Sequence, residues 1–170
     1  MTFLELVKER YSCRKLKKDP IDDKLLQQII EAAYVAPTSK NSQPFKIWVA
    51  RSDDALKKVV AACKQDLGGS VAIVVGYSSG EAWVRPYDGH DFSENDAAIA
   101  ATHIMMEIQD LGLAACWLGN FEPEKLRAEF PEMKDYGLIA VFQIGYPAED
   151  AEPSPRHTEF RDRDEIIEVL

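Results

Sequence analysis

Cysteine and histidine are scarce in this sequence, and neither occurs at a spacing that suits a metal ion. The chain of 170 residues contains three of each. The cysteines Cys13, Cys63 and Cys116 are odd in number, form no Cys-x-x-Cys pair and have no histidine at ligand spacing. These features argue against a disulfide framework and against a zinc site. We therefore expect no metal in the functional site and no special role for the histidines, His90, His103 and His157.

A long hydrophobic run is also missing. A membrane-spanning helix needs about 18 or more apolar residues in succession. The best candidate, residues 97–115, contains His103, Glu107 and Asp110. The first residues lack the basic stretch and apolar block of a secretory signal. The sequence therefore predicts a cytoplasmic protein that does not enter the membrane.

Positive charge is not in excess, because the formal net charge is −9. Nucleic acids and anionic membrane surfaces are bound by clustered lysines and arginines. We therefore expect neither of them as a partner. One basic segment, residues 8–18, runs against this background. Taken alone, it is either a solvated helix end or a local anion-binding segment.

The length and the hydrophobic pattern predict one α+β domain. We expect helices over residues 2–10, 22–36, 53–64, 93–111 and 123–130, and strands over residues 45–50, 70–77, 115–118 and 138–145. Residues 78–92 are expected to form a loop. No Gly-x-Gly-x-x-Gly follows the first strand, which argues against a classical dinucleotide-binding fold.

The predicted helix over residues 93–111 is apolar around much of its circumference. Ser93 and Asp96 have the spacing of a capping box, and Gly112 is expected to end the helix. A helix that is apolar on more than one side needs a second covering surface. It is therefore either a core helix of one subunit or a helix that also packs across a homodimer. The charged, proline-containing tail over residues 148–170 adds little to a core, so it either hangs loose or lies on a partner.

Two polar segments form the candidate site. Arg10, Ser12 and Arg14 place two fixed cations and a hydroxyl about one helical turn apart, and guanidinium groups suit a phosphate. The loop over residues 37–43 offers the amide and hydroxyl groups that suit a heteroaromatic ring. Each segment alone also fits an ordinary solvated helix end or an ordinary connection. Together they predict a phosphorylated, ring-bearing cofactor between the N-terminal helix and the first long strand.

Four segments in register resemble the FMN-dependent nitroreductase family, and they span nearly the whole chain. They are Arg10-Tyr11-Ser12-Cys13-Arg14, the loop from Pro37 to Phe45, Leu111-Gly112-Leu113 running into Cys116-Trp117-Leu118-Gly119, and Gly145-Tyr146-Pro147. The resemblance implies an α+β fold with a mixed sheet and a long central helix. It also implies a homodimer of one-domain chains, residues 1–170, with flavin sites at the interface and the tail over residues 148–170 packed on the partner.

The resemblance also implies a set of cofactor-binding residues. Arg10 and Ser12 would hold the FMN phosphate, and Arg14 would lie nearer the ring, where a cation favours reduction. The remaining residues of the set are Pro37, Thr38, Ser39, Asn41 and Gln43 along the flavin, Leu118 and Gly119 with backbone facing N5, and Arg156 at the phosphate. Ser154 stands where the family commonly has a second basic residue. Lys40 stands where members often have a small residue or glycine, and no ligand role is implied for it.

The activity that the resemblance implies is that of an FMN oxidoreductase. NADH or NADPH would reduce the flavin by hydride transfer to N5, and a nitroaromatic, a quinone or a similar acceptor would then take its place. No catalytic side chain is required, and Cys116 is expected to be a small buried hydrophobic residue. One alternative is a flavin enzyme with a specific physiological substrate. Another is a non-catalytic flavin-binding or flavin-storage protein, or a degenerate homologue, and the loss of a cation at Ser154 favours this last group.

Overall fold

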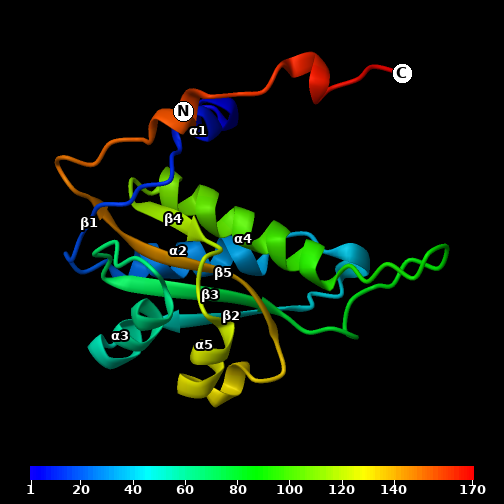
Figure 1. The fold of residues 1–170 in the computed structure, drawn as a ribbon, viewed down its shortest axis with the longest axis horizontal. Coiled ribbons are helices and arrows are strands. Elements are labelled where there is room, and N and C mark those ends of the chain that lie inside the picture. Colours follow the sequence, from blue (N-terminus) through cyan, green and yellow to red (C-terminus); the bar gives the residue numbers. More distant parts are fainter.

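The computed structural model describes residues 1–170 and shows helices packed on both faces of a five-stranded sheet (Figure 1). The helices are α1 (Phe3–Glu9), α2 (Asp23–Tyr34), α3 (Asp53–Ala62), α4 (Ser93–Asp110) and α5 (Pro123–Glu129). The strands are β1 (Leu16–Lys17), β2 (Phe45–Ala50), β3 (Val71–Tyr77), β4 (Ala114–Leu118) and β5 (Gly137–Pro147). The predicted α+β class is confirmed, and only β1 was not foreseen. None of the helices combines the length and the apolar character needed to cross a membrane.

The sheet is antiparallel throughout, so the expectation of a mixed sheet is wrong. Its order is β1-β5-β3-β2, and β4 pairs with β5 beside β1. A strand, a helix and a strand in succession usually give parallel neighbours. Here β3, α4 and β4 follow one another, and β3 and β4 do run in the same direction. However, β5 lies between them and pairs antiparallel with each.

The predicted buried strand is the centre of the fold. Ile73, Val74 and Val75 of β3 are fully buried. Because successive side chains of a strand point to opposite faces, Ile73 and Val75 join the core under α2 and α4. Val74 faces the other core, which lies under α3 and α5 and contains Leu126. The two hydrophobic cores therefore fix the helices on both faces of the sheet.

The start of α4 differs from the prediction, since Ser93 and Asp96 form no capping box. The N-cap residue is Phe92, which makes no side-chain capping bond, and Ser93 lies inside the helix. The Oδ1 atom of Asp96 instead accepts hydrogen bonds from the backbone N–H and the hydroxyl of Ser39, both at 3.0 Å. A tertiary contact has replaced the local one. The helix ends as expected, before Gly112, whose φ is +71°.

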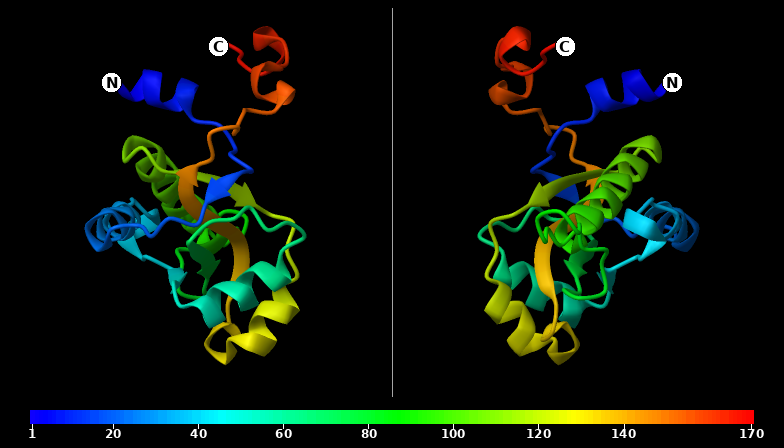
Figure 2. Two further views of the ribbon diagram at one scale, coloured as in Figure 1. Left: turned by 90° about the vertical axis from the view of Figure 1, so that its left-hand side faces the viewer. Right: turned by 90° about the vertical axis from the view of Figure 1, so that its right-hand side faces the viewer.

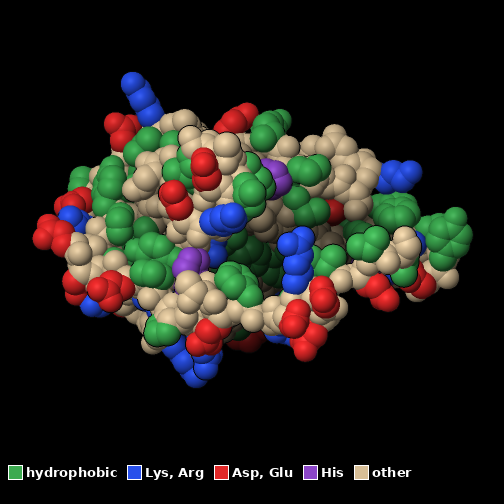
Figure 3. Space-filling view, turned by 90° about the horizontal axis from the view of Figure 1, so that it is seen from above, with side chains coloured by type: hydrophobic (Ala, Val, Ile, Leu, Met, Phe, Trp, Pro, Cys, Tyr) green, Lys and Arg blue, Asp and Glu red, His purple; other side chains and the backbone are tan.

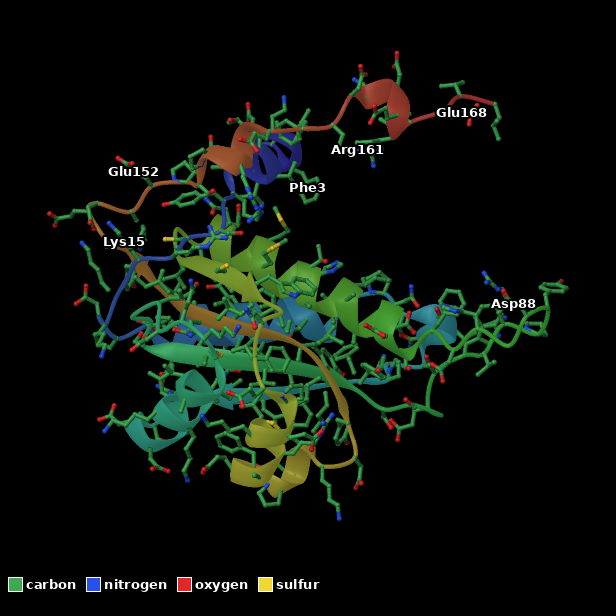
Figure 4. The ribbon with its side chains drawn as sticks, viewed as in Figure 1. Phe3, Lys15, Asp88, Glu152, Arg161 and Glu168 are labelled. Carbon is green, nitrogen blue, oxygen red and sulfur yellow. The ribbon has the colours of Figure 1, made fainter.

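The two ends of the chain project above the sheet, and α1 is held there by its contact with α4. Figure 2 shows α1 and the C-terminal segment as two separate arms above the sheet. Every residue from 159 to 170 is exposed. Figure 4 places Phe3 on the first arm, and Arg161 and Glu168 on the second arm. The tail therefore contributes nothing to the core of its own chain beyond residue 158.

Candidate functional site

A polar cavity of about 290 Å³ lies where the segment after α1 meets the start of the tail. Its lining contains no hydrophobic residue and consists of Arg10, Ser12, Arg14, Ser154, Arg156 and His157. The structure thus brings together the predicted phosphate ligands from the two ends of the chain. His157 was not expected there. The only sequence signal for it is its position next to Arg156.

The three arginines of this cavity have no acidic partner. No carboxylate lies within 4.0 Å of Arg10, Arg14 or Arg156, although other lysines and arginines form ion pairs. Arg14 Nη1 donates only to the backbone oxygen of Ser12, at 3.2 Å. Guanidinium groups keep their charge and match two oxygen atoms in one plane. In a chain with a net charge of −9, this cavity is therefore suited to a phosphate group.

Local contacts order the residues around this cavity, and none of these contacts brings a negative charge to the three arginines. Tyr11 meets His157 edge to face, with ring centroids 6.3 Å apart. Burial, and then the neighbouring Cys13, raises the pKa of the Tyr11 phenol, so this side chain adds no negative charge. The hydroxyl of Ser154 accepts from the backbone N–H of Arg156 at 3.4 Å. Ser154 therefore supports the turn that carries Arg156, although it supplies no charge.

A second cavity, of about 500 Å³, adjoins the first, and Arg14 borders both. Its other lining residues are Lys64, Gln65, Cys116, Trp117, Leu118, Gly119 and Asn120. The predicted positions Leu118 and Gly119 are therefore in the cavity, and Cys116 is 5% exposed, as expected for a buried small residue. Lys64, Gln65 and Asn120 were not predicted from the sequence to lie in the site. Asn120 had a usable signal, because it directly follows Gly119 at the end of a strand.

Gln143 fixes the loop that carries Lys64 and Gln65. Its side chain is fully buried. The Nε2 atom donates to the backbone oxygen of Gln65, and Oε1 accepts from the N–H of Leu67, both at 2.8 Å. A buried amide with both ends bonded holds a loop firmly. This wall of the second cavity is therefore set by β5.

The loop over residues 37–43 lies elsewhere in the chain. None of its residues lines either cavity. Ser39 contacts the first turn of α4, whereas Phe3 and Leu6 of α1 lie against the far half of this helix. The helix has 18 residues, which corresponds to about 27 Å. Figure 1 shows the loop, in cyan, and the segment that follows α1, in blue, at opposite ends of α4. Within one chain the two halves of the predicted site therefore lie at opposite ends of α4 and do not meet.

The conformation of this loop is unusual. Lys40, Asn41 and Gln43 have φ values of 55°, 55° and 50°, in the left-handed region that favours glycine. The loop closes on itself through Gln43, whose backbone N–H donates to Thr38 Oγ1 and whose Nε2 donates to Asn41 Oδ1, both at 3.0 Å. Pro37, Lys40, Asn41 and Gln43 are exposed. The loop thus presents an ordered polar surface outward.

A groove of about 390 Å³ runs between α1 and α4. It is lined by Met1, Thr2, Phe3, Leu6, Ala32, Thr102, His103, Met106, Glu107 and Asp110. Figure 3 looks onto the face that carries α1 and the tail, and it shows hydrophobic side chains around a hollow in this face. Phe3, at 71% exposed, and Ile99, at 38%, have no covering partner in the chain. The second apolar side of α4 therefore remains open.

The segment over residues 78–92 is an ordered projection beside the loop over residues 37–43. Val84 and Asp91 form an antiparallel bridge, and Arg85 pairs with Asp88. The Arg85 guanidinium also lies over the ring of Phe92, 5.6 Å from its centroid. Figure 4 shows Asp88 near the end of this projection, far from the body. The expected loop is thus closer to a hairpin.

Comparison with known proteins gives one consistent family. The sequence model of the nitroreductase family matches residues 7–72 and 68–146. A nitroreductase family protein from Clostridium difficile 630 has a crystal structure that superposes with a TM-score of 0.90, at 30% identity over 99% of this chain and 98% of the other. An NADH dehydrogenase from Thermus thermophilus is 25% identical, and the match covers 87% of this chain and 88% of that protein.

Two further solved structures share the fold. An FMN-dependent nitroreductase from Clostridium difficile R20291 has a TM-score of 0.77 at 22% identity, covering 98% of each chain. A Desulfovibrio desulfuricans protein solved in complex with FMN has a TM-score of 0.78 at 22% identity, covering 98% of this chain and 95% of the other. Because the family model matches most of the sequence and the fold agrees with that of a member over nearly its full length, the chain belongs to the nitroreductase family.

Proposed function

We propose that this protein binds FMN and uses NADH or NADPH to reduce small electron acceptors such as nitroaromatics and quinones. The observation that carries the proposal is the cavity in which Arg10, Arg14 and Arg156 meet without an acidic partner. It opens beside a second, larger cavity with a mixed polar and apolar lining. A phosphate on a flat heterocycle has the chemistry that fits this pair of cavities. The FMN reported for two proteins of the same fold supports this choice.

The residues present fit FMN at its phosphate end. Arg10, Arg156 and the Ser12 hydroxyl offer donors to a phosphate dianion, and no carboxylate competes. Arg14 borders both cavities and would lie between the phosphate and the ring. A fixed cation there would stabilise negative charge on the ring edge at N1. Gly119 and Asn120 are both exposed, and their backbone N–H groups would serve as donors to the ring.

When bound, FMN would supply a two-electron carrier that takes a hydride from NAD(P)H at N5 and passes it to the acceptor. The protein would bind and orient this group, and no side chain would have to transfer a proton. Trp117 and Leu118 would form an apolar wall that excludes water from one side of the ring. The nucleotide and the acceptor would use the same open face in turn, which is a ping-pong scheme.

The proposal includes a homodimer, because one chain holds only part of the predicted site. A second copy would bring its loop over residues 37–43 to the two cavities of the first. Its Pro37, Thr38, Ser39, Asn41 and Gln43 would then lie along the flavin. The open groove between α1 and α4 is an apolar surface that such a partner would cover. The site would therefore be complete only between two chains.

The tail over residues 148–170 would pack on the partner. Its large hydrophobic side chains are exposed in the single chain, namely Phe160, Ile166, Ile167, Val169 and Leu170. Each large hydrophobic side chain removed from water contributes about 1.5–3 kcal/mol. Only the first part of the tail is held by its own chain, through ion pairs such as Lys15 with Asp150 at 2.6 Å. An arm of this kind gains stability by lying across a second copy.

One observation favours a second candidate, a flavin-binding or flavin-storing protein without turnover. Ser154 lines the arginine cavity at the position where the family resemblance implies a further basic residue. The phosphate would then be held by fewer charges, and flavin would leave more readily. A flavoprotein that binds FMN and does not react with NADH or NADPH would match this second candidate.

Steady-state kinetics of the FMN-loaded protein tests the proposed function. Oxidation of NADH or NADPH should depend on added quinone or nitroaromatic, and double-reciprocal plots at several acceptor concentrations should be parallel. Intersecting lines would contradict the proposal that the nucleotide and the acceptor use the same open face in turn. Bound FMN with no oxidation of either nucleotide would favour the storage function.

A further inference from the structure

Asp96 is a buried carboxylate without a cationic partner. It is 1% exposed and belongs to no ion pair. Oδ1 accepts two hydrogen bonds from Ser39, and Oδ2 is buried without any partner. A buried charge is costly unless it is fully paired. The first turn of α4 offsets only part of this cost, through the partial positive charge at a helix N-terminus.

The helix itself gains little from this side chain. Asp96 does not cap α4, and all of its side-chain hydrogen bonds go to Ser39. The packing of this part of α4 on the sheet is supplied by small apolar residues, among them Ala97, Ala100 and Ala101, which are fully buried. The hydrogen bonds of this carboxylate therefore act on the loop over residues 37–43 and not on the backbone of α4.

The loop needs an external anchor. Lys40, Asn41 and Gln43 have left-handed φ values although each carries a side chain. Such conformations persist only where surrounding contacts enforce them. Most hydrogen bonds within the loop are accepted by its early residues, Thr38 and Ser39. Ser42 donates to the backbone oxygen of Ser39 from its N–H at 3.1 Å and from its hydroxyl at 2.8 Å. Ser39 is the one loop residue whose side chain bonds to a helix, and its partner is Asp96.

We propose that Asp96 is a positioning residue that presets the loop over residues 37–43 for the cofactor. The inference rests on the proposed function, in which this loop meets FMN. Asp96 would act only through Ser39 and would not touch the cofactor itself. By holding the loop in its binding conformation before the cofactor arrives, it would remove an ordering cost from binding.

Hydrogen exchange in the cofactor-free protein tests the anchor directly. In Asp96→Ala, the amides of Ser39, Ser42 and Gln43 should exchange at least about tenfold faster, because the loop loses a charge-assisted anchor. The amides of β3 should keep their protection, which would show that the fold is intact. Asp91→Ala is the matched control, since Asp91 accepts from Ser93 at the same helix end, at 2.7 Å, and does not contact the loop. Equal exchange of the loop in Asp96→Ala and wild type would overturn the inference.

Asp96→Asn keeps an acceptor oxygen and serves if the alanine variant does not fold. A neutral acceptor forms hydrogen bonds about half as strong as those of a carboxylate. We expect its loop exchange to lie between those of wild type and Asp96→Ala. Full protection of the loop in Asp96→Asn would show that the charge is not used.

The affinity for FMN tests whether the contact between Asp96 and Ser39 aids cofactor binding. The Kd should rise at least about tenfold in Asp96→Ala, less in Asp96→Asn, and not in Asp91→Ala. Faster loop exchange with an unchanged Kd would overturn the cofactor role of Asp96. If wild type bound no FMN, the proposed function would fail, and the anchor would still stand or fall on the exchange result.

Discussion

Arg10 and Arg156 come from opposite ends of the chain and line one cavity without an acidic partner. Replacing either by alanine should weaken FMN binding about 10- to 100-fold, because hydrogen bonds to charged groups contribute about 1.5–3 kcal/mol. Fluorescence titration of FMN measures this. Arg51→Ala is the matched control, since Arg51 pairs with Asp23 outside the cavities. An unchanged affinity for FMN in both Arg10→Ala and Arg156→Ala would show that FMN does not bind in this cavity.

Ser154 offers a test in the opposite direction. Ser154→Lys places a fourth cation in the arginine cavity and should tighten FMN binding about two- to fivefold, as expected for a partly exposed ion pair. The gain should shrink as salt is added. Ser154→Ala separates the loss of the hydrogen bond to Arg156 from the gain of charge. Equal affinities of Ser154→Lys and Ser154→Ala would contradict the prediction.

Lys40 tests the strain of the loop over residues 37–43. Its φ of 55° suits glycine better than any residue with a side chain. Lys40→Gly should leave the free energy of unfolding unchanged or raise it by up to about 1 kcal/mol, and Lys40→Val should lower it by about 1–2 kcal/mol. Urea unfolding of the three proteins measures the difference. A valine variant as stable as the glycine variant would show that the loop relaxes.

Cys63 gives a pH prediction. Burial raises the pKa of its thiol to about 11 from 9.0, so the folded protein holds this proton more tightly than the unfolded chain. The corresponding stability is fully present below about pH 9 and is lost as the pH rises towards 11. At pH 8, iodoacetamide should label Cys63 far more slowly in the folded protein than in urea. Mass spectrometry of the peptide reports this, and equal rates in both states would refute it.

Mixed dimers test the shared site. One chain would carry Arg10→Ala with Arg156→Ala, and the other Asn41→Ala with Gln43→Ala. Each variant alone should bind FMN poorly. In a mixed dimer, one site collects both defects and the other has none, so about half of the wild-type FMN content should return. Mixed dimers that stay as empty as the parent proteins would show that each site is built from a single chain.

The polar segments were readable from the sequence because their chemistry is local. Arg10, Ser12 and Arg14 lie close together in the chain, and the central strand is a short run of β-branched residues. The meeting of Arg156 with this segment depended on the family resemblance. His157, Lys64 and Gln65 could not be found in this way, because each reaches a cavity only through the tertiary fold.

Asp96 shows why other features of the structure could not be predicted from the sequence. Its spacing from Ser93 indicated a capping box. Its carboxylate instead accepts hydrogen bonds from Ser39, which is distant in the sequence. The mixed sheet that the family resemblance implied is absent for a similar reason. The order of β3, α4 and β4 predicts parallel neighbours, and only the later strand β5 separates them. In both places a long-range contact overrides what the local succession of residues or elements would favour.

The most direct test is the absorption spectrum of the protein after incubation with excess FMN and desalting, followed by anaerobic addition of NADH or NADPH. The proposed function predicts that oxidised-flavin bands stay with the protein and bleach when one of the nucleotides is added. Flavin that is retained but never bleaches, or a protein that retains none, would contradict it.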